Sequence, residues 1–292
     1  MRLLNSFLRV SQRALGRAGR DLVSASQRIS VSPSFTADET RTLQRNQSFA
    51  NRHKGQRCFV IATGPSLKEQ NIDSLGDEIT FAMSGFWQHP VVEKWQPTYY
   101  CFSDPAYFNG SLPMLEFFRS MGKRIHSSSF FAPLAAREVI ENQLLLPLDH
   151  TNWVAFRGEL NDNHADKRQI DLTRDIPGAM SVSQLCIMAA IYMSCSPIYL
   201  LGLDHDWLAH KGEAGHFYSG HGGLEKHPDF KPQLTDWSYK FLMECQLKLW
   251  LGYETLKSIA ERKGIHIVNA THGGFLDVFD REDYRNVIAR PQ

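Results

Sequence analysis

Short apolar runs alternate along the chain with longer amphipathic segments, and this alternation predicts a succession of strands and helices. The apolar runs are rich in β-branched and aromatic residues, which is typical of parallel strands buried on both faces. We expect strands at 57–62, 78–83, 98–103, 123–127, 197–202 and 265–269, and helices at 66–75, 111–121, 133–142, 180–194 and 234–263. The pattern predicts an α/β fold with a Rossmann-like, mostly parallel, doubly wound sheet.

The residues that follow five of these strands are small or polar. In an open α/β sheet the carboxyl ends of the strands converge, and ligands bind at that edge. Each such residue alone is more often a helix cap or a turn former, but five strand ends of this character together favour a ligand site. The candidate nucleotide-binding residues are Thr63, Gly64, Pro65, Ser66, Ser84, Ser103, Asp104, Asp204 and Asn269.

The most informative of these strand ends is the first, Cys58-Phe-Val-Ile-Ala-Thr-Gly-Pro-Ser-Leu-Lys68. An apolar strand runs directly into a Gly-Pro-Ser turn and then into a helix. We expect backbone N–H groups of this turn to hold an anion, and Gly64 to let a ligand approach the backbone. Pro65 suits the first helical turn because it has no N–H to satisfy there. An ordinary strand-to-helix turn is the competing interpretation.

A long segment between residues 204 and 233 carries five of the twelve histidines. A loop of this length inside a compact domain is usually functional, and we expect a lid. His216 and His221 are candidate general bases for an acceptor hydroxyl, while Tyr218 and Lys211 can assist a phosphate leaving group. One alternative is a metal site built from His205, His210, His216 and the flanking carboxylates, although their spacing matches no common zinc pattern. Another alternative is a loop of solvated histidines.

The first 30 residues form a basic amphipathic pattern. Six arginines and one acid occur there, and the leucine and phenylalanine positions share one helical face. Such a helix can lie on an anionic membrane surface, pack on the domain or on a partner, or serve as an organellar presequence. We expect an amphipathic helix at 1–30, a polar linker at 31–54 with a short helix near Glu39–Ala50, and one Rossmann-like domain at 55–292.

Composition narrows the class of protein. A chain of 292 residues with 42% hydrophobic residues can bury a full core, and a net charge of +1 argues against a nucleic-acid partner. The five cysteines show no CxxC pairing, so we expect core thiols in a reducing compartment. No apolar run is long enough to span a membrane. The expected location is cytoplasmic, with peripheral attachment to the inner membrane face through residues 1–30.

Neither GxGxxG nor GxxxxGK[ST] is present, which argues against a hydride-transfer enzyme and an ordinary ATPase.

Four stretches support a family resemblance. Ala62-Thr-Gly-Pro-Ser-Leu-Lys68 resembles the Gly-Asn-Gly-Pro-Ser-Leu nucleotide loop of bacterial CMP-sialic-acid-dependent sialyltransferases, and it is similar to the motility accessory factors of flagellin glycosylation. Tyr100–Pro105 and Ile198–Asp204 resemble two further strand ends of the sialyltransferases, Asn-Pro and Gly-Ile-Asp. Asn269-Ala-Thr-His-Gly-Gly274 resembles an Asn-Ala-Thr-x-Gly-Gly run of the accessory factors. Thr63, Ser84 and Asp104 stand where that superfamily has asparagines.

The resemblance implies a glycosyltransferase that moves a sugar, with a nonulosonic acid as the candidate, from a CMP-linked nucleotide-sugar donor to a cell-surface glycan or lipid-linked acceptor. Either His216 or His221 would then be the base. No cofactor is required, although Mg²⁺ on the phosphates is compatible, as is a homo-oligomer. Two alternatives stay open. One is a Mg²⁺-dependent pterin pyrophosphokinase of a related branch, with Asp104, Asp204 and Asp206 as its acids. The other is a non-catalytic nucleotide-binding assembly protein.

Overall fold

The computed structural model describes residues 35–160, 169–210, 216–218 and 238–290. The chain divides into two compact units, Met1–Asp38 and Glu39–Gln292. The amphipathic helix expected at 1–30 lies outside the described residues, so it stays a prediction, as do the boundaries of the three expected regions. The second unit holds the sheet.

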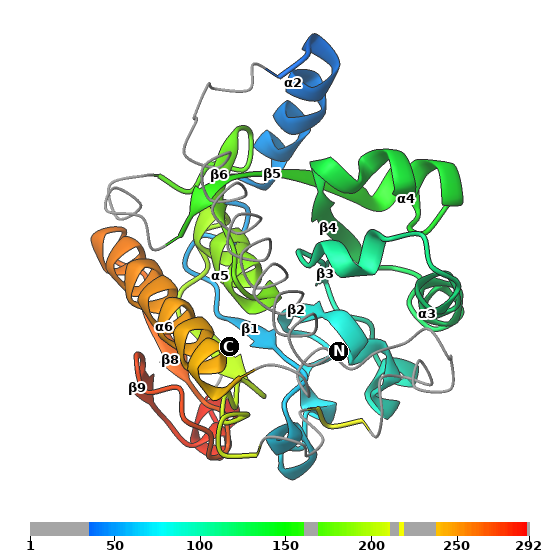
Figure 1. The fold of residues 1–292 in the computed structure, drawn as a ribbon. Helices are drawn as coiled ribbons and strands as arrows, with labels where there is room; N and C mark the ends of the chain where they lie inside the picture. The colour runs from blue at the N-terminus through cyan, green and yellow to red at the C-terminus, as the bar shows by residue number, and fades with distance from the viewer. Residues whose placement is uncertain (1–34, 161–168, 211–215, 219–237, 291–292) are drawn as a thin grey trace, which may run out of the picture. The chain divides into compact units, whose positions relative to one another are not determined.

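A nine-stranded sheet forms the centre of this unit (Figure 1). Its strands are β1 (Cys58–Ile61), β2 (Ile79–Met83), β3 (Tyr99–Cys101), β4 (Ser129–Pro133), β5 (Thr151–Glu159), β6 (Asp175–Gly178), β7 (Ile198–Leu201), β8 (Ile267–Asn269) and β9 (Asp280–Arg281). Neighbouring strands pair in parallel throughout, in the order β6-β5-β4-β3-β2-β1-β7-β8-β9. The predicted α/β class and parallel sheet are confirmed.

The sheet has one topological switch point, between β1 and β7. From β1 the chain adds strands in one direction as far as β6, and then returns to place β7 on the other side of β1. Cys58 to Ile61 pair with Ile79 to Ala82 on one side and with Ile198 to Leu201 on the other. In such sheets the loops that leave the two strands at the switch point diverge, and ligands bind outside their carboxyl ends.

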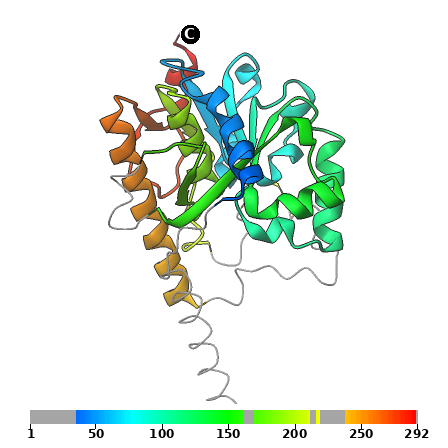
Figure 2. The same ribbon diagram turned by 90° about the horizontal axis from the view of Figure 1, so that it is seen from above.

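Helices cover both faces of the sheet. The α-helices are α2 (Ala37–Gln44), α3 (Leu112–Gly122), α4 (Arg137–Gln143), α5 (Val182–Tyr192), α6 (Tyr239–Arg262) and α7 (Tyr284–Ile288). Figures 1 and 2 show α5 and α6 on one side of the sheet and α3 and α4 on the other. Short 3-10 helices fill most of the remaining connections: η1 (Arg45–Phe49), η2 (Pro65–Glu69), η3 (Asp73–Leu75), η4 (Ser84–Gln88), η5 (Pro90–Glu93), η6 (Pro105–Phe108), η7 (Leu134–Ala136) and η8 (Leu148–His150).

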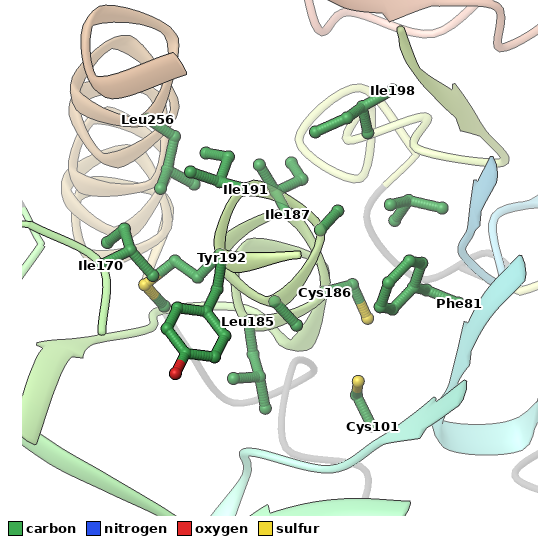
Figure 3. Packing of buried hydrophobic residues seen from close by; sticks show 14 of the residues in the cluster. Phe81, Cys101, Ile170, Leu185, Cys186, Ile187, Ile191, Tyr192, Ile198 and Leu256 are labelled. Atoms are coloured by element: carbon green, nitrogen blue, oxygen red, sulfur yellow. The ribbon is translucent and has the colours of Figure 1, made fainter. Parts of the chain in front are cut away.

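The main core lies between the sheet and α5. All eleven residues of α5 are buried, as expected of a helix that is apolar on every side. Alternate strand residues, such as Cys58 and Val60 of β1, belong to this cluster because successive strand side chains point to opposite faces. Figure 3 shows side chains of α5 among those of the strands and of α6: Leu185, Cys186, Ile187, Ile191, Phe81, Cys101, Ile198 and Leu256.

Several expected elements differ in place or type. The strand expected at 123–127 lies at Ser129–Pro133, because the residues buried on both faces are Phe130, Phe131 and Ala132. The helix expected at 66–75 is two 3-10 turns, separated by Gln70 in an extended conformation. Gln70 Nε2 donates to the carbonyl of Ala270 at 2.8 Å, which ties this connection to the loop after β8. The sequence pattern also missed β5, β6 and β9.

Within the segment expected as a linker, residues 37–49 form α2 and η1. Asn46 is buried and donates through Nδ2 to the carbonyls of Trp153 at 2.8 Å and Leu172 at 2.7 Å. Phe49 belongs to the core and packs edge-on against Phe131 at 5.2 Å between ring centroids. Among the helices that the structure describes, none is both long and apolar enough to cross a membrane.

Candidate functional site

The switch-point turn, residues 63–66, connects β1 to η2. Gly64 donates its N–H to the carbonyl of Gly202 at 2.9 Å, so the turn is held against the loop after β7. A Cβ on Gly64 would lie 1.7 Å from Asp204 Oδ2 and 2.4 Å from the Gly202 carbonyl oxygen. Glycine is therefore required here by the close approach of Asp204. The space that we expected a ligand to use is filled by this side chain.

Asp204 fixes the turn from the other side of the switch point. Its Oδ1 accepts from the Ser66 N–H at 3.1 Å, and its Oδ2 accepts from the Ser66 hydroxyl at 2.9 Å. The side chain is 6% exposed. Burial raises the pKa of Asp204, the two bonds from Ser66 oppose that rise, and the negative charge of Asp206 adds to it. Both carboxylate oxygens thus serve the turn itself.

The backbone N–H groups of Gly64, Ser66 and Leu67 are engaged inside the protein, so they do not contribute to the anion cradle that we expected. The N–H of Gly64 goes to Gly202, that of Ser66 goes to Asp204, and that of Leu67 donates to the Gly64 carbonyl at 3.1 Å. Pro65 opens η2 and has no N–H. A ligand at this edge must therefore be held mainly by side chains and by other loops.

Three residues of the histidine-rich segment lie on the turn. Phe217 donates its backbone N–H to the Thr63 carbonyl at 2.8 Å, and His216 Nδ1 lies 3.0 Å from Thr63 Oγ1. The Phe217 ring is buried and packs edge-on against Phe86 and His89, with centroids 6.5 and 5.1 Å apart. The structure therefore brings His216 and Thr63, two predicted site residues 153 positions apart, into hydrogen-bonding contact.

Tyr218 lies beside the loop after β2. Its ring stacks with that of His216 at 4.9 Å and 18°, and a Cβ on Gly85 would lie 2.5 Å from its phenol. Burial raises the pKa of Tyr218 far above its usual range, and a hydrogen bond with Thr63 only partly opposes the rise. The phenol is therefore neutral at every physiological pH and can act as a hydrogen-bond donor.

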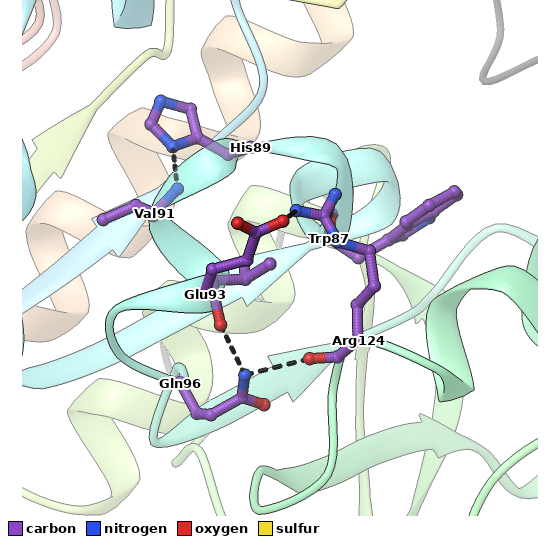
Figure 4. A network of polar contacts seen from close by, with 7 residues as sticks. Trp87, His89, Val91, Glu93, Gln96 and Arg124 are labelled. Carbon is purple, nitrogen blue, oxygen red and sulfur yellow. Dashed lines mark hydrogen bonds and ion pairs between the residues drawn. The ribbon is translucent and has the colours of Figure 1, made fainter.

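Polar contacts hold the loop after β2 that receives Phe217 and Tyr218 (Figure 4). Arg124 donates to the Trp87 carbonyl at 2.8 Å and to Glu93 Oε1 at 2.9 Å. Gln96 Nε2 donates to the Arg124 carbonyl at 2.9 Å, and His89 Nδ1 accepts from the Val91 N–H at 3.2 Å. The surface under Phe217 is thus fixed by bonds between consecutive loops.

A second hydrogen-bonded chain starts at His205, next to Asp204. His205 Nε2 lies 2.7 Å from the Tyr253 hydroxyl, which lies 2.6 Å from Ser183 Oγ, which lies 2.7 Å from Ser181 Oγ at the start of α5. Burial lowers the pKa of His205 to about 4, so its imidazole is neutral at physiological pH. The residue adopts a left-handed backbone conformation with φ of 49°. We call this chain the His205 network.

The remaining predicted residues have local roles. Asp104 is exposed and caps η6, accepting from the Ala106 N–H at 2.8 Å. Ser84 has φ of 48°, and its carbonyl accepts from the Tyr100 hydroxyl at 2.7 Å. Asn269 is fully buried and bonds to Leu276 and Thr271 of its own loop. Ser103 is half-buried beside Asp104 in the loop after β3. Lys211 and His221 lie outside the described residues.

Three features of the site carry little or no signal in the sequence. Phe217 is the residue that seats the segment, Gly85 gives room to Tyr218, and Tyr253 links α6 to His205. The only available signal for Phe217 was an aromatic residue between two candidate catalytic residues. Tyr253 gave none, because its bond to His205 crosses 48 positions and depends on tertiary packing.

Metal-ligating side chains do not gather in the part of the chain that is described: it holds no group of three His, Cys, Asp or Glu residues that could bind an ion. The three histidines of the alternative metal site have separate partners, with His205 on Tyr253, His210 on Asp206 and His216 on Thr63. Asp206 is the acid next to Asp204. Its Oδ2 lies 3.5 Å from His210 Nε2, and its negative charge acts on the Asp204 side chain.

Comparison with known proteins corrects the expected family. Residues 36–209 match the model of a family described as 6-hydroxymethylpterin diphosphokinase MptE-like. No curated protein matches the chain. The sialyltransferase resemblance is therefore wrong, and so are the glycosyltransferase activity and the CMP-sugar chemistry drawn from it. The Gly-Pro-Ser turn that both families share pointed to the wrong family, because its residues bond mainly to the protein itself. The pyrophosphokinase alternative is the better supported one.

Proposed function

The chain belongs to the family of 6-hydroxymethylpterin diphosphokinase MptE-like proteins, and from this premise we propose that it transfers diphosphate from a nucleoside triphosphate to a hydroxymethyl group. The observation that carries the proposal is the placement of His216 and Tyr218 on the switch-point turn, at the edge where parallel α/β sheets bind ligands. This arrangement sets a candidate base and a neutral phenol donor side by side.

The reaction needs a deprotonated acceptor oxygen. That oxygen attacks the β phosphorus of the nucleoside triphosphate, the bond from this phosphorus to the oxygen bridging it to the α phosphorus breaks, and the nucleoside monophosphate leaves with the electron pair. His216 takes the hydroxyl proton. When Nδ1 donates to Thr63 Oγ1, Nε2 carries the lone pair that a general base requires. His221 is the alternative base.

The N–H groups of Gly64 and Ser66 are engaged inside the protein, so other groups must meet the negative charge of the phosphates. We assign this task to Lys211 and to the phenol of Tyr218. A Mg²⁺ ion bound together with the nucleotide would be held by Asp206. The ion, when bound, withdraws charge from the phosphate oxygens and makes the phosphorus more electrophilic. The half-buried, neutral Tyr218 donates where charge develops on the leaving oxygen, and its partial burial strengthens that bond.

One observation favours a second candidate function, which is nucleotide binding without turnover. Both oxygens of Asp204 and the N–H groups of Gly64, Ser66 and Leu67 are engaged inside the protein. A protein in which the turn only holds the loops after β1 and β7 together, and which has lost transfer activity, would show the same contacts. The two candidates differ in turnover.

The test begins with thermal shift and calorimetry on ATP, GTP, CTP and CMP, each with and without Mg²⁺, because a ligand that binds the folded state raises its stability. Phosphorus NMR then follows ATP with 6-hydroxymethylpterin, in which AMP and a diphosphate ester should appear together. His216→Ala should lower the transfer rate about 100-fold or more with ATP affinity retained, and His126→Ala, a change at an exposed histidine, should not.

Each outcome decides between the candidates. If His221→Ala abolishes transfer and His216→Ala does not, His221 is the base. ATP binding without AMP formation supports the non-catalytic candidate. If no nucleoside triphosphate stabilises the protein, both candidates are wrong.

A further inference from the structure

Phe275 is a half-exposed aromatic residue beside the switch point. Its side chain is 53% exposed, although its backbone N–H donates to the Asp204 carbonyl at 2.7 Å. Asp204 in turn binds Ser66 of the switch-point turn through both carboxylate oxygens. Two hydrogen-bonded steps therefore connect the backbone of Phe275 to the turn that leaves β1.

The loop that carries Phe275 is rigidly built. Asn269 Nδ2 donates to the Leu276 carbonyl at 2.8 Å, and Arg281 donates to the carbonyls of Leu276 at 3.0 Å and Thr271 at 2.9 Å. Arg281 also donates to the Gly273 carbonyl. These bonds fix the backbone on both sides of Phe275, while Leu276, the next residue, is completely buried.

Two glycines bring the loop against Asp204. Gly273 and Gly274 both have positive φ, of 70° and 74°. A Cβ on Gly274 would lie 2.7 Å from the Asp204 backbone, so glycine is required there by contact as well as by conformation. The chain thus places a large apolar ring in solvent on a backbone that is fixed before any ligand arrives.

We propose that Phe275 is the stacking platform for the planar heteroaromatic ring of a ligand at this edge. The inference rests on the proposed function, whose nucleoside triphosphate and pterin alcohol both carry such a ring. An aromatic face stacks on any flat ring without the need for a particular hydrogen-bond pattern. Because the backbone is already ordered, little conformational entropy is lost when the ring is covered.

The experiment compares three probes on the full chain by calorimetry: ATP, inorganic tripolyphosphate and 6-hydroxymethylpterin. Phe275→Ala should weaken the binding of the ring-bearing probe by between about fivefold and a hundredfold. Tripolyphosphate has no ring, so its affinity should change less than about twofold. If ATP is the affected probe, Phe275 stacks on the nucleobase, whereas an effect on the pterin alone assigns the acceptor ring.

Three further variants separate stacking from general damage. Phe275→Trp should retain or increase affinity, and Phe275→Leu should behave like alanine because it keeps apolar area without an aromatic face. Tyr239→Ala is the matched control: Tyr239 is 55% exposed, at the start of α6, which projects beyond the sheet (Figure 2). Far-UV circular dichroism checks that each variant is folded.

The failure of the stacking inference is distinct from failure of the proposed function. Equal affinity of wild type and Phe275→Ala for both ring-bearing probes refutes the stacking role and leaves the function intact. An equal loss for ATP and tripolyphosphate also refutes it, because a phosphate contact or a fold defect would then be responsible. If wild type binds none of the three probes, the proposed function fails, and the stacking inference fails with it.

Discussion

The His205 network should make the stability of the protein depend on pH in a defined window. The pKa of His205 is about 4 in the folded protein and about 6.5 in an unfolded chain. Between these values the unfolded state binds more protons, so the free energy of unfolding rises as pH rises from about 4 to 6.5 and then stays level. At about 1.4 kcal/mol per pH unit, the full effect is about 3 kcal/mol.

His205→Asn isolates this contribution. Asparagine tolerates the left-handed conformation that His205 adopts at φ of 49°, and it has no group that titrates in this range. The variant loses the bond to the Tyr253 hydroxyl, which keeps its partner Ser183. The change should therefore lower stability at pH 7.5 by about 1 kcal/mol and remove most of the pH dependence due to His205.

The assay is urea unfolding at pH 4.5, 5.5, 6.5 and 7.5, followed by far-UV circular dichroism. The difference in unfolding free energy between wild type and His205→Asn should shrink as pH falls and reverse below about pH 5.5. His126→Asn, at an exposed histidine, is the control. Asp204 acts in the opposite sense, because its raised pKa makes the folded state bind protons more tightly, so its contribution falls as pH rises. That contribution is shared by wild type and variant and cancels in the difference.

A constant difference between wild type and His205→Asn across this pH range would refute the reasoning. It would mean that His205 is protonated in the folded protein at the same pH as in the unfolded chain, and hence that burial does not govern its titration.

Two other predictions test the switch-point turn and the segment that lies on it. Gly85→Ala should lower the free energy of unfolding by about 1–3 kcal/mol, because the new Cβ would meet the Tyr218 ring at 2.5 Å. This loss should largely vanish in a Tyr218→Ala background. Equal losses in both backgrounds, measured by urea unfolding, would contradict the contact. Ser66→Ala removes a hydroxyl that is bonded to the buried carboxylate of Asp204, and it should lower Tm by about 3–9 °C. The control Ser48→Ala, at an exposed site, should change Tm by less than about 2 °C. Similar shifts for both variants would show that the Ser66 hydroxyl contributes little to stability.

The sequence pattern predicted the centre of the sheet better than its edge. β1, β2, β3, β7 and β8 lie where short apolar runs predicted strands, because a parallel strand covered on both faces must be apolar along its length. β5 and β6 were missed because their residues are mixed: Arg157 and Glu159 stand in the first and Pro177 in the second. β6 is the edge of the sheet, and Arg157 and Glu159 lie in the part of β5 beyond its pairing with β4. Strands at and near an edge tolerate such residues, so their composition resembles that of loops.

Part of the candidate site could also be predicted. The rule that ligands bind at the carboxyl ends of strands brought Thr63, Ser66 and Asp204 together. The structure places Ser66 and Asp204 in hydrogen-bonding contact, with Thr63 at the other end of the same turn. The rule could not show which partner each residue takes. The bond from Thr63 to His216 crosses 153 positions, and no local pattern encodes a contact of that range.

The physical roles of the turn residues explain why its motif pointed to the wrong family. Gly64 is glycine because Asp204 and the Gly202 carbonyl occupy the space beside its Cα, and Ser66 uses both its N–H and its hydroxyl on Asp204. These requirements arise where the loops after β1 and β7 contact each other at the switch point. A protein with the same loop contacts therefore needs the same residues, whatever ligand it binds. The motif therefore reports the fold. Information about the ligand must lie in side chains that do not take part in the contacts between these loops. Phe275 is the clearest of these among the described residues, since its backbone N–H bonds to Asp204 while its ring is exposed.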